Sequence, residues 1–336
     1  MLLSAFLLLL APLPPQNPLP LQLEGVDPAS GALRYSLEHA HIDALVGLGQ
    51  AQLDGLLLPD GSLATLELER IEHERFEWGF HVDGQPRPGL LDSSSLSVWK
   101  GRLADKPGSD ALLAFSHYGV HGWIVTGTQL VHVISRPTPG AGWTSADVLF
   151  VDEQNLAAAR AALPQGCVAL PLPGSSVTPS YAATSANGPA ALLAPSCSLR
   201  RCTISIESDF QFFQRFLDVS AQATYIATLW TFISDRFQTQ ASTALSFPYV
   251  GIYTTANDPW TTPDGPGNLS QMLDEFRLAW AGAIPGGGRL GHFMSGAMIG
   301  GGAAYLNTLA STSFNFGVSG NLDALAPFPI AQNPAN

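Results

Sequence analysis

A proline-rich segment near the middle of the chain most constrains its fold. Six prolines lie among Ser, Ala and Gly in residues 164–198: Pro164, Pro171, Pro173, Pro179, Pro189 and Pro195. This composition is typical of an extended, solvated linker and not of a packed helix or strand. Because 336 residues are typical of two domains, we predict domains at 21–163 and 201–336, joined by a linker at 164–200.

The first twenty residues have the pattern of an export signal followed by a spacer. Residues 1–12 form a short apolar run, and prolines are frequent from 12 to 20. The run is too short to cross a bilayer and is typical of a secretory signal, although it lacks the usual Lys or Arg before it. We therefore predict that residues 1–20 are a signal peptide and spacer and that the protein is secreted; a misassigned start codon is the alternative.

The charge of the chain excludes some classes of partner. Its formal net charge is −12, and only 12% of its residues are charged, while 46% are hydrophobic. An acidic chain poor in Lys and Arg binds nucleic acid and anionic membranes weakly. Beyond the N-terminus no stretch is long and apolar enough for a transmembrane helix. The hydrophobic content is sufficient for a sizeable core.

The region before the linker reads as mostly β. Short β-branched or aromatic runs at 112–116, 122–125 and 130–134 are separated by glycine and polar turns. This spacing predicts a meander of antiparallel strands. Residues 66–80 alternate apolar and polar side chains in the same way, which favours a further strand.

The region after the linker alternates strand and helix patterns. Strand patterns occur at 203–206 and 247–253. One amphipathic helix is predicted from the helical spacing of Ile226, Leu229, Trp230, Ile233 and Phe237. Another is predicted after a cap at Asn268 or Ser270, with an apolar face of Met272, Leu273, Phe276 and Trp280. The order predicts an α/β layer with a mixed sheet.

A glycine-rich segment near the C-terminus points to function. His292 begins a short run that leads to Gly300, Gly301 and Gly302 and then to an apolar stretch at 303–309. Glycine permits close backbone approach, and the apolar stretch reads as a short strand. Such a strand is well placed to offer unpaired N–H and C=O groups to an extended peptide.

Four segments, in order, carry a resemblance to a known family: 206–210, 253–260, 273–280 and 292–309. Together they resemble bacterial reprolysin/adamalysin-like metzincin zinc metalloproteases. The resemblance implies an α+β or α/β fold class, with a β-rich pro-domain at 21–163. The N-terminal subdomain of a metzincin (zincin-like) fold would follow at 201–336, with a mixed sheet and two main helices. The implied function is a secreted zinc-dependent metalloendopeptidase precursor.

The resemblance also assigns roles to residues. The strand at Ala304, Tyr305 and Leu306 would bind an extended peptide or protein substrate. Zinc would be held by a helical H-E-x-x-H-x-x-G-x-x-H motif, which this sequence lacks. The catalytic and zinc-binding residues are therefore expected beyond Asn336, and the chain alone is expected to be inactive. Many family members carry a cysteine where this sequence has Ala310.

None of the eight histidines fits a zinc motif. His117 and His121 have the i, i+4 spacing, but they flank a predicted turn where that spacing does not converge. His39 and His41 share one face of a predicted strand and are either metal ligands or solvated side chains. For His292 we favour a hydrogen-bonded structural role.

The chain has three cysteines, Cys167, Cys197 and Cys202. An odd number in an exported chain implies either a free thiol or a disulfide partner that is missing. In the family, a pro-segment cysteine can occupy the open zinc position, and Cys167 is our candidate for this latency role; the alternative is a buried or disulfide-linked cysteine. Cys197 and Cys202 either pair across a small loop or pair beyond Asn336. Arg200-Arg201 is either a processing site or an ordinary pair of surface arginines.

Calcium is a second metal that the resemblance implies. Glu207 and Asp258 lie in segments that supply oxygen ligands to a structural calcium in reprolysins, and carboxylates suit that ion. Both residues are equally explained as helix caps or surface charges. The sequence leaves the oligomeric state open.

Two other functions compete with the protease. The first is an exported, non-catalytic binding or scaffold module that retains a metzincin-like half-domain. The second, a serine hydrolase, is disfavoured because no G-x-S-x-G elbow is present and Ser295 has only His292 nearby.

Overall fold

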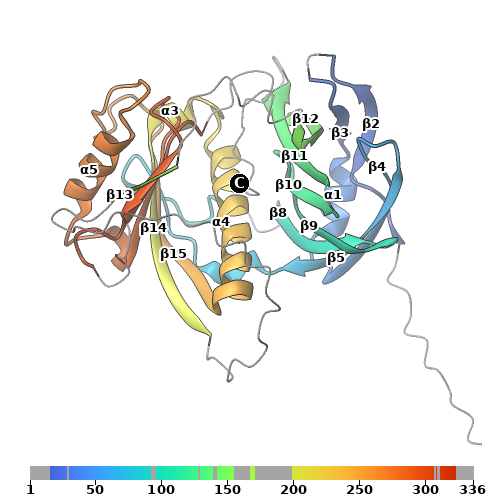
Figure 1. The fold of residues 1–336 in the computed structure, drawn as a ribbon, viewed down its shortest axis with the longest axis horizontal. Helices are drawn as coiled ribbons and strands as arrows, with labels where there is room; N and C mark the ends of the chain where they lie inside the picture. The colour runs from blue at the N-terminus through green and yellow to red at the C-terminus, as the bar shows by residue number, and fades with distance from the viewer. Residues whose placement is uncertain are drawn as a thin grey trace, which may run out of the picture.

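The computed structural model describes residues 16–28, 30–91, 96–127, 129–138, 142–154, 167–170, 199–305, 308 and 311–322, with the backbone alone at 167–170. Two β-sheets stand on either side of one long helix, α4 (Val219–Ala241) (Figure 1). Among the described residues, no helix has both the length and the apolar character that a membrane crossing requires.

The first sheet has ten strands in the order β1-β4-β5-β8-β9-β10-β11-β12-β3-β2. Their bounds are β1 Gln16–Asn17, β2 Leu21–Val26, β3 Leu33–Leu37, β4 Gln50–Leu57, β5 Leu63–Ile71, β8 Leu96–Leu103, β9 Lys106–Ser116, β10 Gly119–Thr126, β11 Gln129–Thr138 and β12 Gly142–Asp152. Short β1 pairs parallel with β4, and the other nine strands form one antiparallel sheet. The sheet curls around α1 (His39–Leu45) (Figure 1).

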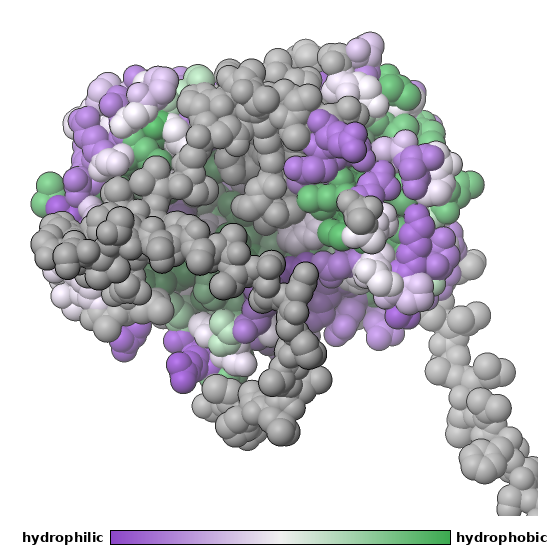
Figure 2. Space-filling view, viewed as in Figure 1, coloured by the Kyte–Doolittle hydropathy of each residue, from purple (hydrophilic) through white to green (hydrophobic). Residues whose placement is uncertain are grey.

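Alternating side chains explain this curl. In β5, Leu66 and Leu68 are buried while Glu67 and Glu69 lie on the opposite face, as the twofold period of a strand requires. The inward residues of the strands pack around Ile42 and Leu45 of α1, which are both fully buried. On the face in Figure 2, hydrophilic and hydrophobic side chains are mixed over this sheet.

The second sheet has eight strands in the order β13-β17-β18-β16-β14-β15-β6-β7. Their bounds are β13 Cys167–Leu170, β17 Gly302–Tyr305, β18 Phe316–Ser319, β16 Leu290–Met294, β14 Arg200–Ser208, β15 Thr243–Ile252, β6 Phe80–Val82 and β7 Gln85–Pro86. Strands β18, β16, β14, β15 and β6 run parallel, while β17 is antiparallel to β18 and parallel to β13. Strands β6 and β7 follow β5 of the first sheet through the 3₁₀ helix η1 (His73–Phe76).

Helix α4 fills the space between the two sheets. Asp218 caps its start by accepting hydrogen bonds from the backbone N–H groups of Ser220 and Ala221. Trp230 packs against Phe247 of β15, and Phe232 packs edge-on against Trp123 of β10. The helix is therefore buried on two sides, and it joins the cores of both sheets.

Three shorter helices complete the second sheet: α3 (Phe210–Phe213), α5 (Leu269–Trp280) and η2 (Pro285–Gly287). Helix α5 covers the face opposite α4, where Phe276 packs against Phe293 and Phe316. The four residues predicted for its apolar face are all buried: Met272, Leu273, Phe276 and Trp280.

The fold class that we predict from the sequence is wrong. The chain is predominantly β and is dominated by the large curled sheet of nine antiparallel strands, not by an α+β metzincin arrangement with two main helices. The physical reason is long-range pairing: many short strands of the N-terminal region bury their apolar faces in one sheet around α1. Within the predicted linker, β13 pairs with β17. The domain bounds themselves stay a prediction.

Candidate functional site

The strand predicted to bind peptide, β17, has neighbours on both sides. Ala304 lies opposite Gly317 of β18 on one side and opposite Ala169 of β13 on the other. The edge of the sheet is therefore β13, so the chain's own segment takes the place that we predict for an extended peptide. Ala304 is exposed and Tyr305 is buried, while Leu306 lies outside the described residues.

Helix α5 holds β17 in position through Tyr305. Its hydroxyl donates a hydrogen bond of 2.5 Å to Asp274 Oδ1, and burial raises the pKa of this phenol to about 12. The ring packs edge-on against Phe314, over which the guanidinium of Arg277 lies at 5.0 Å. The side chain of Tyr305 points toward α5. Because successive side chains of a strand point to opposite faces of the sheet, Ala304 lies on the other face, where it is exposed.

The loop before β17 depends on close backbone packing. A Cβ at Gly296 would lie 2.4 Å from the backbone carbon and oxygen of Gln211, so a larger residue does not fit. Gly300 has a φ of +104°, in the region that favours glycine. Gly296 thus brings the loop against α3, and Gly300, which the sequence singles out, helps to turn the chain into β17.

Asp209 holds this loop against the end of β14 through hydrogen bonds, a role that we do not predict from the sequence. Its carboxylate accepts hydrogen bonds from the backbone N–H groups of Phe212 (2.8 Å) and Gly296 (3.0 Å), and from the Ser295 hydroxyl. Burial raises its pKa to about 6, although these bonds act in the opposite direction. An aspartate directly before an apolar helix start is a capping signal, so this role of Asp209 could have been predicted from the sequence.

Glu207, one residue from the end of β14, is buried with one oxygen unpaired. Tyr249 donates a hydrogen bond of 3.2 Å to Oε2, while Oε1 has no partner. Gly251 leaves the room for Oε1, since a Cβ there would lie 2.4 Å from it. Burial raises the pKa of Glu207 to about 8, with a further contribution from Asp258. The carboxyl group is therefore mostly protonated at neutral pH.

The predicted calcium pair does not fit that ion as it stands. Both oxygens of Asp258 accept backbone N–H groups, Oδ2 from Phe210 and Oδ1 from Trp260. Calcium takes six to eight oxygens, whereas Glu207 offers one unpaired oxygen. Within the described ranges, no group of three or more His, Cys, Asp or Glu side chains is arranged to hold a metal ion. Zinc likewise has no candidate ligand set there.

The histidines considered as metal ligands or structural residues in the sequence have local partners. His292 Nε2 lies 3.0 Å from Ser319 Oγ, and its ring packs edge-on against Trp230. His117 Nε2 lies 2.7 Å from Asp43 Oδ1, whereas His121 is buried against Tyr225 with a pKa lowered by burial to about 4. His117 and His121 thus have separate surroundings.

The structure brings His39 and His117 together, which the sequence does not predict. Their rings meet edge to face at 5.1 Å, and His39 Nε2 bonds to the Thr144 carbonyl at 2.9 Å. His41 instead contacts the Leu19 carbonyl through Nδ1 at 3.1 Å. His39 and His41 are in helix α1 and not in the strand that we predict, so they have different partners.

Two of the three cysteines lie in the second sheet, on different strands. Cys167 is the first residue of β13, opposite Gly302, and Cys197 lies outside the described residues. Cys202 in β14 is a free thiol whose pKa burial raises. Arg200 and Arg201 pair with β15, so the predicted processing site is in a strand of the sheet.

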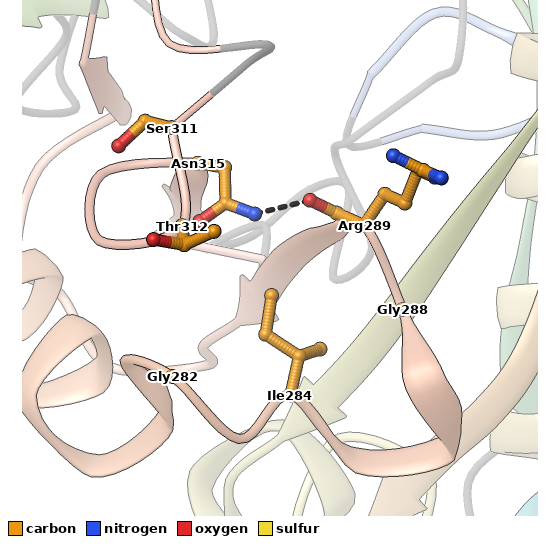
Figure 3. Close-up of a pocket in the computed structure, with 7 residues that line it drawn as sticks. All are labelled: Gly282, Ile284, Gly288, Arg289, Ser311, Thr312 and Asn315. Carbon is orange, nitrogen blue, oxygen red and sulfur yellow. Dashed lines mark hydrogen bonds between the residues drawn. The ribbon is translucent and has the colours of Figure 1, made fainter.

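A separate cavity of about 230 Å³ lies at the amino ends of β16 and β18 (Figure 3). Asn315 donates from Nδ2 to the Arg289 carbonyl, and its Oδ1 has no partner. The lining residues are Gly282, Ile284, Gly288, Arg289, Ser311, Thr312 and Asn315. None of the predicted site residues lines this cavity.

Comparison with known proteins leaves the family open. No known protein family matches the sequence, and no curated protein matches it. Among solved structures, the chain is similar to metalloproteinase-II from Bacteroides fragilis. The identity is 10% and the TM-score 0.44, covering 95% of this chain and 86% of that one. A likeness at this level does not assign the reprolysin type and carries no argument about activity.

Proposed function

We propose that the chain is part of the precursor of a secreted zinc-dependent metalloendopeptidase, and that β17 is its peptide-binding strand. One observation carries the proposal: β13, a segment from the predicted linker, pairs with β17 along Gly302–Tyr305. The backbone of β17 is thus positioned to accept an added strand, and in this form it holds a strand of the same chain.

The residues of this chain would bind and orient the substrate. Once β13 leaves, the backbone of β17 would pair with an extended peptide, with the strand held by Tyr305 and Asp274. Ala304 would lie beside a residue of the peptide, as it lies beside Ala169 now, with its small side chain on the exposed face of the sheet. Zinc would supply activation of the attacking water when bound. Its ligands are expected beyond Asn336.

A non-catalytic peptide-binding module is the second candidate function. The same pairing of β13 with β17 favours it, because strand addition uses backbone hydrogen bonds and requires no metal. The two functions share the binding strand and differ only in whether hydrolysis follows.

The coding sequence after Asn336, together with a hydrolysis assay, tests the protease proposal. We expect an open frame encoding H-E-x-x-H-x-x-G-x-x-H, and zinc-dependent cleavage of labelled casein by the longer product after processing. The 336-residue chain should cleave nothing with or without added zinc. A longer product that binds peptide through β17 without hydrolysis would contradict the protease and support the binding module.

A further inference from the structure

A cavity of about 370 Å³ with both polar and apolar lining lies at the first sheet, away from the residues of β17. It opens where β2 and β3 meet the β11–β12 hairpin and the start of α1. Its volume is within the range of small-molecule sites. The residues that line it are Glu24, Arg34, Ser36, Leu37, His39, Thr138, Thr144, Ser145, Ala146 and Asp147.

Arg34 places an unpaired donor at this cavity. It lies on β3 opposite Leu149 of β12 and Gly25 of β2, so the β2 neighbour has no side chain to cover it. Its Nε is buried without a hydrogen-bond partner, and no ion pair reaches it within the described residues. The buried Nε is closed to solvent, so a ligand oxygen would bond to the outer nitrogens of the guanidinium, which lines the cavity.

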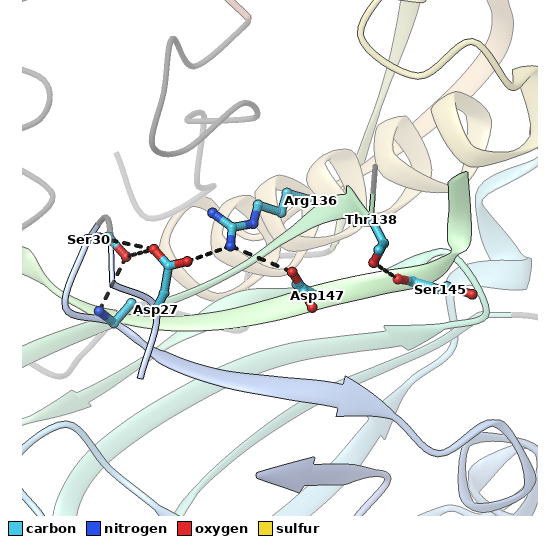
Figure 4. A network of polar contacts seen from close by, with 7 residues as sticks. Asp27, Ser30, Arg136, Thr138, Ser145 and Asp147 are labelled. Atoms are coloured by element: carbon cyan, nitrogen blue, oxygen red, sulfur yellow. Dashed lines mark hydrogen bonds and ion pairs between the residues drawn. The ribbon is translucent and has the colours of Figure 1, made fainter. Parts of the chain in front are cut away.

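Two carboxylates supply acceptors at the same cavity. Glu24 receives a hydrogen bond of 2.7 Å from Ser36 at Oε1. Asp147 is held through Oδ2 at 3.6 Å by Arg136, which Asp27 holds in turn at 2.6 Å (Figure 4). Each cavity carboxylate therefore keeps lone pairs for further donors.

His39 and Thr138 add neutral acceptors. Because the Thr144 carbonyl only accepts, His39 must donate from Nε2, which leaves a lone pair on Nδ1. Thr138 donates its hydroxyl proton to the Ser145 carbonyl and retains its oxygen lone pairs (Figure 4). The cavity thus combines one strong donor group with several fixed acceptors.

We infer that this cavity binds a carbohydrate unit, with Arg34 donating to a ring or hydroxyl oxygen and Asp147 and Glu24 accepting from hydroxyls. A sugar hydroxyl both donates and accepts, so it satisfies donors and acceptors of one cavity together. An anionic ligand would meet repulsion from two carboxylates, and an apolar ligand would leave the guanidinium of Arg34 without an acceptor. The inference is independent of the proposed protease function.

Titration of the full chain with glucose, galactose, mannose and N-acetylglucosamine, followed by saturation-transfer NMR and calorimetry, tests this inference. At least one sugar should bind, and Arg34→Met, which keeps the apolar stem, should weaken it at least tenfold. Glu24→Gln, on an exposed edge strand, gives a second variant that leaves the core untouched and should weaken binding severalfold. Arg102→Met removes an exposed arginine elsewhere on the same sheet and should bind as wild type.

Three outcomes overturn the inference. They are no binding by any of the four sugars at 50 mM, equal binding by wild type, Arg34→Met and Glu24→Gln, and tighter binding of sulfate or acetate than of every sugar. The last would make the cavity an anion site. Thermal melts of each variant establish that a loss of binding is not a loss of fold.

Discussion

Leu170 of β13 lies opposite Tyr305 of β17 in a parallel strand pair, the last of four such pairs that begin with Cys167 and Gly302. This relationship places a segment of the predicted linker along the strand that we propose for peptide binding. Because β13 is tethered to the same chain, it competes at high effective concentration with any peptide in solution. The strand is therefore expected to be closed until β13 is displaced.

Gly296→Ala should destabilise the loop that leads to β17. The added Cβ would overlap the backbone at Gln211, which cannot move without disturbing α3. We expect a loss of about 1–3 kcal/mol in the free energy of unfolding, measured by urea denaturation. Gly108→Ala is the matched control, since a Cβ there meets nothing within 4 Å, and it should change stability by less than about 0.5 kcal/mol.

Glu207→Gln should flatten the fall of stability with rising pH between about 4.5 and 8. The unfolded carboxyl titrates near 4.5 and the folded one at about 8, so the native state binds more protons between these values. Stability from this group is present below 4.5 and falls as pH rises to about 8. The neutral amide removes this loss. Melting curves from pH 5 to 9 that fall equally for the variant and wild type would rule the assignment out.

His73→Leu should make the protein more resistant to acid. His73 is fully buried on η1, both ring nitrogens lack hydrogen-bond partners, and burial lowers its pKa to about 4. Arg70 and Glu74 are the charged groups that act on it. Since the unfolded histidine takes a proton near 6.5, stability is lost as pH falls from there to about 4.

The measurement for His73 is urea unfolding at pH 7 and pH 5. The variant should match or exceed wild type at pH 7, because leucine loses no hydrogen bond, and should lose less stability at pH 5. Equal losses in the two proteins would show that His73 does not titrate on unfolding.

Calcium should leave the melting temperature of the 336-residue chain unchanged. Glu207 has one unpaired oxygen, and both Asp258 oxygens accept backbone N–H groups, so the pair lacks the oxygens that the ion requires. The check is a thermal melt in millimolar calcium against one in chelator. A rise of several degrees that Glu207→Gln abolishes would restore the calcium site.

The local spacing of apolar residues predicted some helices and strands well. The pairing of strands that lie far apart in the sequence could not be predicted from it. The spacing of Ile226, Trp230 and Phe237 identifies a helix that the structure has as Val219–Ala241, because the helical period is a local property. The pairing of Val82 with Ile252 joins distant segments and has no local signature. The predicted fold class failed for this reason, since sheet closure depends on such pairs.

In the candidate site, too, the features with a local sequence signal could be predicted and those that depend on long-range pairing could not. The glycines at 300–302 and the short strand after them were recognised in the sequence. The capping position of Asp209 was not assigned, although its place before an apolar helix start is a local signal. That Ala169 lies beside Ala304 could not be predicted, because a short run among prolines reads as linker. The meeting of Arg34, His39 and Asp147 at one cavity likewise depends on the curl of the first sheet.

The most direct test of the central claim compares Val168→Pro and Ala169→Pro in binding a labelled peptide of residues 165–172. In a parallel pair, alternate residues of β13 direct their N–H groups to β17 and the others point outward. Proline removes that N–H, so only one of the two variants should open β17 and bind the peptide strongly by fluorescence anisotropy. Wild type and the other variant should bind weakly. Equal binding by all three proteins would contradict the account.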